Sequence, residues 1–350
     1  MKQFWSTSII IFSVLMLFNC KNSSVKEKTK IYNIPEIDKL SAEIEKNPKN
    51  AALYAARSLQ FSQKEMLQEA ELDAEKALGL DSSKVDYYKI LADAYFDNMH
   101  SNAAIKILQR SLGRFPQEKA LYLKLAEMQM IVEQYKDCAL TLDMLFKISP
   151  DNPDGIFIRA QAREMTGDTV EAVKDFEKVV SIDADHINAY MKLALIKNRN
   201  GDPVTLRYLE NVLRIDSLNE AALLTRAQYY HFRNEFEKAL TEYKNALIRK
   251  PQSANINYNL AQMYLEMGDA AKGNKTKADS YYESAFQHFD NSTKFDVQFA
   301  DAYFYKAISA QRLNRNDLAI RDLENALRLG SFLYTVSPET VEQELAKLKQ

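Results

Sequence analysis

The residues of this 350-residue chain that could bind a metal or transfer a proton are few and far apart. The four histidines fall in well-separated stretches: His100, His186, His231 and His288. Asp183 and Asp185 closely precede His186, but the glycine and the terminal glutamate of a calcium-binding loop do not follow them. The sequence therefore predicts no metal site.

Motifs for cofactor binding and for covalent catalysis are also absent. The eight glycines are scattered and cannot form a Gly-rich phosphate loop, and there is neither a nucleophile elbow nor a His-Glu-x-x-His pair. The 46 basic and 48 acidic side chains leave a formal net charge of −2, which gives no bulk attraction for nucleic acid. We expect a protein that is not an enzyme, holds no cofactor and does not bind nucleic acid.

Cys20 follows a segment that is typical of a secretory signal peptide. Lys2 precedes a largely apolar stretch from Phe4 to Phe18, which is shorter than the roughly 20 residues of a membrane-spanning helix. Leu17-Phe18-Asn19-Cys20 resembles a bacterial lipobox, with Asn19 where a small residue is usual. The resemblance implies a cleaved lipoprotein signal peptide over residues 1–19 and a lipid on Cys20. An uncleaved membrane anchor is the alternative.

Residues 20–33 are polar and charged, and we expect them to form a flexible tether behind the lipidated cysteine. Because Lys21 rather than Asp follows Cys20, the lipobox resemblance implies a place in the cell envelope, with the lipid in the outer membrane. The other cysteine, Cys138, then has no disulfide partner. We expect it to be a buried, small apolar residue.

The elements that would position these residues are helical. The chain has only eight Gly and eight Pro, whereas an all-β sandwich or barrel needs many Gly/Pro-rich turns. A period of 34 residues runs through the sequence. One ladder consists of Ala92, Ala126, Ala160 and Ala194, and a second consists of Ala70, Ala104, Cys138 and Ala172. Pro116 and Pro150 stand at the same interval.

Each period contains two amphipathic helical patterns, as residues 220–253 illustrate. Leu223, Ala227 and Tyr230 share one helical face, a polar turn follows, and a second pattern ends before Pro251. The second face consists of Phe236, Ala239, Tyr243 and Ala246. A coiled coil is excluded because a turn recurs within each period and no heptad persists.

These positions resemble the tetratricopeptide repeat (TPR), a 34-residue helix–turn–helix unit. The resemblance implies an all-α, right-handed superhelical solenoid of about eight repeats over residues 51–333, with capping helices at 34–50 and 334–350. The expected repeats are 51–84, 85–118, 119–152, 153–186, 187–219, 220–253, 254–299 and 300–333. Gly167, Gly201 and Gly268 are expected in the turns between paired helices.

Two repeats depart from the common length. The fifth lacks one residue near Asp202 and Pro203, which predicts a tight turn inside its helix pair. The seventh has twelve extra residues, which we place as an insertion at 270–281, with Ala285, Phe289 and Ser292 in the usual sites. A register with Ala278, Tyr282 and Ala285 in those sites also fits and divides the insertion in two. The insertion is either a contact loop or a tolerated surface loop.

The TPR resemblance also implies a concave groove lined by the first helix of each repeat. At the positions that face this groove in the family, the middle of the chain carries mostly apolar side chains. The candidate partner-binding residues are Leu123, Met130, Ile131, Phe157, Gln161, Met165, Met191, Leu195, Leu224, Gln228, His231, Phe232, Tyr258, Gln262 and Leu265. The alternative for any one of them is packing between adjacent first helices.

These expectations combine into one functional hypothesis, with a second from another class. We expect a lipid-anchored envelope adaptor, or scaffold, that binds protein or peptide partners in its groove and contacts the membrane through its N-terminal lipid. The alternative is an accessory binding protein that delivers a small molecule or glycan to an envelope transporter. Glycan binding is disfavoured because the one tryptophan, Trp5, lies in the predicted signal peptide.

Overall fold

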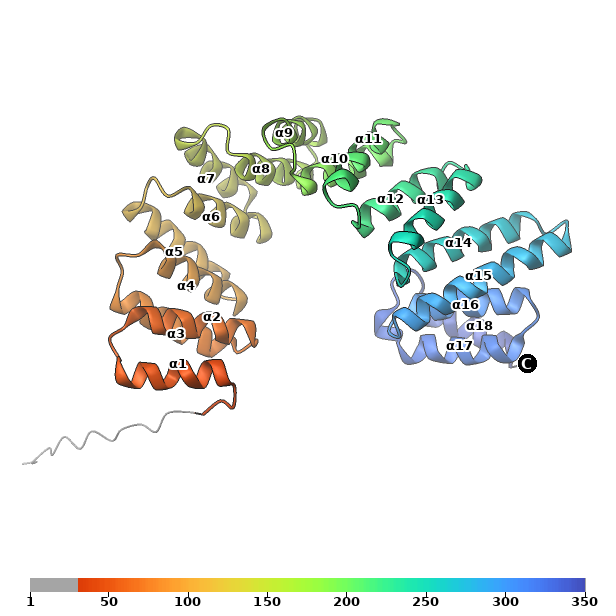
Figure 1. Cartoon of the computed structure of the whole chain (residues 1–350), viewed down its shortest axis with the longest axis horizontal. Coiled ribbons are helices and arrows are strands. Elements are labelled where there is room, and N and C mark those ends of the chain that lie inside the picture. The colour runs from red at the N-terminus through yellow and green to blue at the C-terminus, as the bar shows by residue number, and fades with distance from the viewer. Residues whose placement is uncertain (1–30, 350) are drawn as a thin grey trace, which may run out of the picture. The chain divides into compact units, whose positions relative to one another are not determined.

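The computed structural model describes residues 31–349, so that Cys20 and the expected signal peptide lie outside the described residues. Within that range the regular structure consists of eighteen α-helices and one 3₁₀ helix, Gly330–Phe332, without a strand (Figure 1). The expected all-α fold is confirmed. None of the described helices combines the length and the apolarity needed to cross a bilayer.

The chain divides into two compact units, which meet in the sequence between Pro116 and Gln117. The first unit contains a single helix and two antiparallel helical pairs. Its helices are α1 (Pro35–Lys46), α2 (Ala51–Gln63), α3 (Leu67–Leu80), α4 (Val85–Asp97) and α5 (Ser101–Arg114). In this unit α2 packs on α3, α4 packs on α5, and α3 contacts the following α4.

The second unit contains six helical pairs and a final single helix. Its helices are α6 (Lys119–Ile131), α7 (Tyr135–Ile148), α8 (Pro153–Met165), α9 (Thr169–Ile182), α10 (Ile187–Arg199), α11 (Val204–Ile215), α12 (Glu220–His231), α13 (Phe236–Arg249), α14 (Ala254–Ala270), α15 (Lys275–Phe295), α16 (Ala300–Arg312), α17 (Asn316–Arg328) and α18 (Pro338–Leu348). Each even-numbered helix from α6 to α16 pairs with the next, and successive pairs stack in sequence order.

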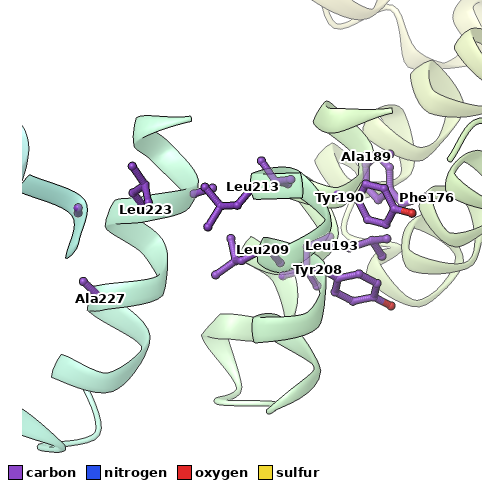
Figure 2. Packing of buried hydrophobic residues seen from close by; sticks show 14 of the residues in the cluster. Phe176, Ala189, Tyr190, Leu193, Tyr208, Leu209, Leu213, Leu223 and Ala227 are labelled. Atoms are coloured by element: carbon purple, nitrogen blue, oxygen red, sulfur yellow. The ribbon is translucent and has the colours of Figure 1, made fainter. Parts of the chain in front are cut away.

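The two ladders of small residues form the contact layer of this stack. Ala126, Ala160 and Ala194 in the first helices are fully buried, as are Cys138 and Ala172 in the second helices. Small side chains let neighbouring helix backbones approach, and larger residues fill the spaces between them. Figure 2 shows this between α9 and α12, where Phe176, Leu193, Tyr208, Leu209 and Leu223 pack in one cluster.

Most helical pairs share the same turn between their two helices and the same signal at the end of the second helix. One turn residue has positive φ, and the following N–H bonds back to the carbonyl of the helix, as Gln134 does to Gln129 at 2.8 Å. The positive-φ turn residues are Glu65, Met99, Glu133, Gly167, Gly201, Asn234 and Asn314. The second helices α5, α7 and α13 end two residues before Pro116, Pro150 and Pro251, as a proline stop predicts.

The insertion in the seventh repeat is helical, which corrects the expectation of a loop at 270–281. Only residues 271–274 separate α14 from α15, and these helices have 17 and 21 residues. Ala278, Tyr282, Ala285, Phe289 and Ser292 are all buried along α15, so the apolar positions of both registers lie on one continuous helical face. Tyr258 contacts Phe289 as Phe157 contacts Phe176 in an ordinary pair, which favours the register with Ala285, Phe289 and Ser292 in the usual sites. The extra residues keep the 3.6-residue period, and helix continues wherever that apolar stripe continues.

Gly268 also lies inside α14 rather than in a turn. A Cβ atom at this position would come within 2.4 Å of the Tyr282 ring, so the glycine allows α15 to pack closely against α14. The fifth repeat differs from expectation as well. Its turn at residues 200–203 is not shortened, and the missing residue shortens α11 to 12 residues.

Ion pairs that the sequence analysis did not predict recur inside the repeats. A cation in a first helix pairs with a carboxylate 16 residues later in the second helix of the same repeat. The pairs are Arg57–Asp73, Arg159–Asp175, Arg226–Glu242 and Lys306–Asp322. Leu193 and Leu209 occupy the same two positions in the fifth repeat, where both are buried. The position therefore accepts either an ion pair or an apolar pair.

Candidate functional site

The candidate site is the surface formed by the first helices α6, α8, α10, α12 and α14, here called the first-helix face. All fifteen expected partner-binding residues lie on these helices or, for Phe232, immediately after α12. They belong to one compact unit. Their exposure divides the face into an open part, from α6 to α12, and a closed part around α14.

Four large apolar side chains are exposed in the open part. Ile131, Met165 and Phe232 are 60%, 65% and 71% exposed, and Leu195 is 42% exposed. Ile131 and Met165 stand at equivalent positions, 34 residues apart, at the ends of α6 and α8. Exposed large apolar side chains on neighbouring repeats are typical of partner sites.

A hollow of about 370 Å³ lies between α6, α8 and α10. Met130 and Ile131 come from α6, and Phe157 and Gln161 come from α8. Glu127, Asp154, Ile158, His186 and Asn188 complete the lining. The lining combines apolar and polar side chains, a combination that suits recognition of an apolar side chain within a polar chain.

Contacts beneath the hollow hold Phe157 in place. Its ring packs against Phe176 at 5.5 Å between centroids and against His186 at 4.8 Å. The Nδ1 atom of His186 accepts the N–H of Ala189 at 3.2 Å and so caps α10. The imidazole is therefore held by the start of the next first helix, and Phe157 is a half-buried support of the site.

One group of ion pairs in the open part is centred on Glu164. Its carboxylate, which is mostly buried, accepts a hydrogen bond from Lys192 Nζ at 2.8 Å and lies 3.8 Å from Arg199. These ion pairs join α8 to α10. Among the candidate residues of α6, α8 and α10, the most exposed side chains are the apolar ones of Ile131, Met165 and Leu195.

The remaining candidates in this region are partly buried. Leu123, Met191, Leu224 and Gln228 are neither fully exposed nor in the core. Gln228 donates to Asn259 Oδ1 at 2.9 Å and thereby joins α12 to α14. Met191 and Leu224 pack against the buried cluster that contains Leu193 and Leu223, which is the alternative that the sequence left open for them.

His231 at the end of α12 and Leu265 of α14, both expected in the groove, are buried, and this corrects the expectation for these two residues. His231 is 6% exposed and Leu265 is 7% exposed. Burial raises the pKa of Tyr243, so its hydroxyl is protonated and donates to Nδ1 of His231 at 3.4 Å. His231 Nε2–H then donates to Glu266 Oε2 at 3.0 Å. The imidazole is a link between α12, α13 and α14.

Tyr258 and Gln262 also serve packing around α14. The Tyr258 ring stacks on Phe299 at 4.7 Å, and its hydroxyl accepts a hydrogen bond from Gln262 Nε2 at 3.0 Å. Burial raises the pKa of Tyr258 to about 12. The side chain stays neutral at physiological pH and can continue to accept this bond.

Residues 31–349 contain neither a metal centre nor a reactive thiol. No three His, Cys, Asp or Glu side chains in this range are grouped so that they could hold a metal ion. Cys138 is buried and free, and burial raises its thiol pKa to about 11. The expected buried position of Cys138 is confirmed.

Comparison with known proteins identifies the repeat. Residues 227–268 match the family model described as TPR repeat. A solved structure of the C-terminal part of a TPR repeat-containing protein from Cytophaga hutchinsonii is 17% identical, with a TM-score of 0.53, over 73% of this chain and 98% of that one. The fold is a solenoid of tetratricopeptide repeats.

Two curated relatives match at low identity. A tetratricopeptide repeat protein 21 homolog from Caenorhabditis briggsae is 21% identical over 60% of this chain. A DnaJ homolog subfamily C member 7 homolog from Schizosaccharomyces pombe is 24% identical over 41% of this chain. The matches span only 20% and 31% of the length of those relatives.

Proposed function

We propose that this protein is a lipid-anchored adaptor of a bacterial cell envelope and that it binds a protein or peptide partner on the open part of its first-helix face. The TPR fold supports an interaction role. The observation that carries the proposal is the hollow between α6, α8 and α10 beside the exposed Ile131 and Met165. An apolar anchor surrounded by polar groups is the usual centre of a protein interface.

Charge substitution at the exposed residues tests the binding face without disturbing the core. Ile131→Asp and Met165→Asp place a carboxylate where a partner's apolar side chain would pack, and each should weaken capture of that partner at least tenfold. The measurement is quantitative affinity capture from detergent-solubilised membranes. Both side chains are more than half exposed, so the free energy of unfolding should change little.

The second helices supply matched controls. Leu140 on α7 and Val170 on α9 are 63% and 70% exposed, close to the exposures of Ile131 and Met165. Leu140→Asp and Val170→Asp should leave capture unchanged. Equal loss in all four variants, or no loss in any of them, would contradict the proposed face.

Anchoring is tested by Cys20. The lipobox resemblance predicts that Cys20→Ala prevents lipid attachment and releases the protein from the membrane fraction. The measurement is the distribution of the full chain between membrane and soluble fractions, together with metabolic labelling by a palmitate analogue. Persistent membrane association without label would instead favour an uncleaved N-terminal anchor.

A further inference from the structure

The lengthened pair α14–α15 forms a second surface where α14 ends and α15 begins, away from the candidate residues of the first-helix face. In an ordinary pair, such as α8–α9, the two helices have 13 and 14 residues, whereas α14 and α15 have 17 and 21. The extra turns adjoin the connection at residues 271–274. They are the structural element in which this chain departs most from its own repeat.

These extra turns and the start of α13 line a hollow of about 480 Å³. Phe236 of α13 and Met267 and Ala270 of α14 provide apolar lining. Gly273 lies at the connection, and Lys277 and Tyr281 lie on the first turns of α15. Ala270, Gly273 and Lys277 are exposed, so the hollow opens to solvent along its rim.

The charge at this hollow has one sign. Lys277 is the one ionised side chain in the lining, and within residues 31–349 it forms no ion pair. Its Nζ lies 5.9 Å from the centre of the Tyr281 ring. The neighbouring Lys272 and Lys275 are instead paired with Asp269 and Asp279, both at 3.0 Å.

The start of α15 adds to this positive potential. Asn274 caps the helix by accepting the N–H of Lys277 through Oδ1 at 3.2 Å, which leaves the amide NH₂ of Asn274 as a donor at the hollow. The N-terminal end of a 21-residue helix carries the positive end of its dipole. The apolar lining can accept an apolar group of a ligand. The Lys277 ammonium and the Asn274 amide beside it can bind a carboxylate next to that group.

We propose that the hollow at the α14–α15 connection is a docking site for a protein segment in which an apolar side chain stands next to an acidic residue. The apolar side chain packs on Phe236, Met267 and Ala270, and the carboxylate pairs with Lys277. The open rim lets a polypeptide pass across the surface, because the chain on either side of the anchor stays in solvent. The site shares no residue with the candidate set of the first-helix face.

Fluorescence anisotropy with short labelled Gly/Ser peptides tests this pairing. One peptide carries a Phe-Glu pair, and the others carry Phe-Gln, Phe-Lys or Ala-Glu. The full chain, reconstituted in lipid nanodiscs, should bind the Phe-Glu peptide saturably, with a Kd of about 1 mM or below. Phe-Gln should bind several-fold more weakly, and Phe-Lys and Ala-Glu should show at least a tenfold loss.

Three variants locate the binding on the hollow. Lys277→Glu reverses the charge and should weaken Phe-Glu binding about tenfold, whereas Lys275→Glu should leave it within twofold. Gly273→Trp fills the hollow and should abolish binding. A Cβ atom at Gly273 meets no atom within 4 Å, and the glycine does not have positive φ, so a residue with a Cβ atom is compatible with the backbone there.

Circular dichroism melting confirms that each variant is folded. The proposal is overturned if the wild-type chain gives no saturable binding, if Phe-Lys binds as well as Phe-Glu, or if Lys275→Glu weakens binding as much as Lys277→Glu. Since no first-helix substitution is used, these outcomes do not depend on whether Ile131 and Met165 bind a partner.

Discussion

At the scale of the residue, the turn position with positive φ is a local source of strain that differs between repeats. Glu133 and Gly167 occupy this position in consecutive repeats, with φ of 61° and 87°. A residue with a Cβ atom pays about 1 kcal/mol or more in this conformation, whereas glycine adopts it freely. The turn of each repeat therefore requires a positive φ at this position, and residues other than glycine occupy it at an energetic cost.

Reciprocal substitutions at these two positions should change stability in opposite directions. Glu133→Gly should raise the free energy of unfolding by about 0.5–1 kcal/mol, since strain is relieved at some cost in chain entropy. Gly167→Ala should lower it by about 1 kcal/mol, although a Cβ atom there meets no neighbour within 4 Å. Urea unfolding followed by circular dichroism measures both. Changes of the same sign would contradict the argument.

Cys138 gives a prediction about reactivity and pH. Burial raises its thiol pKa to about 11, so in the folded protein its thiolate is rare at pH 8. In a Cys20→Ser chain, native Cys138 should react with a maleimide at least a hundredfold more slowly than in urea. The raised pKa of the folded thiol also makes stability depend on pH, because the unfolded chain ionises first. The contribution of the buried thiol to the free energy of unfolding is fully present below the unfolded thiol pKa, about 8.5, and is lost as the pH rises from there towards 11. Fast native labelling would indicate an accessible thiol.

At the scale of the element, the cation–carboxylate pair inside a repeat is exchangeable with an apolar pair. Arg226 and Glu242 lie 2.7 Å apart and are each about four-fifths buried. Arg226→Leu alone should cost about 1–3 kcal/mol, because Glu242 is left without its cation. Arg226→Leu with Glu242→Leu recreates the Leu193–Leu209 arrangement of the fifth repeat and should be within about 1 kcal/mol of wild type. A double-mutant cycle measures this coupling, and additive losses would refute it.

The lengthened pair gives the second prediction at this scale. Removing residues 268–279 deletes twelve residues and brings Ala285, Phe289 and Ser292 to the spacing from α14 that an ordinary repeat has. All three are already buried, so the shortened chain should fold with similar helicity. Circular dichroism and the unfolding midpoint test this. Loss of the native helicity would show that the first turns of α15 are required for packing.

A structural feature can be predicted from this sequence when it recurs at the same position of successive repeats. The Ala ladders, the proline stops and the buried Cys138 follow from spacing alone, because each residue has the same neighbours in each repeat. The closed part of the first-helix face does not follow. His231 is buried and contacts Glu266 and Tyr243, and these contacts depend on the residue types of this pair of repeats rather than on the repeat spacing.

The helical insertion shows the same difference. Its apolar stripe is visible in the sequence at Ala278, Tyr282, Ala285 and Phe289, but a loop and a helix give the same residue count. Gly268 supports a turn by composition, yet it lies inside α14, where the absence of a Cβ atom leaves space for the Tyr282 ring. Tertiary contact decided between two locally acceptable structures.

At the scale of the whole molecule, the C-terminal residues determine whether the stack ends in a polar surface. Asp301 is buried in α16 and accepts hydrogen bonds from the Tyr334 and Thr335 N–H groups, both at 3.0 Å, and from the Thr335 hydroxyl at 2.6 Å. This holds the segment before α18 in place. Val341 of α18 is then fully buried against the cluster that contains Leu323 of α17.

Removing this cap should change the association state of the protein. Truncation after residue 333 uncovers the apolar face of α17, and Asp301→Ala should loosen the same cap while keeping the full length, since terminal repeats need a polar outer face. We expect concentration-dependent oligomers in both variants by light scattering after size-exclusion chromatography, with the truncation showing the larger effect. Tyr334→Ala is the control, because its side chain is exposed and its N–H remains. A monomeric truncated chain would show that α17 is sufficient to end the stack.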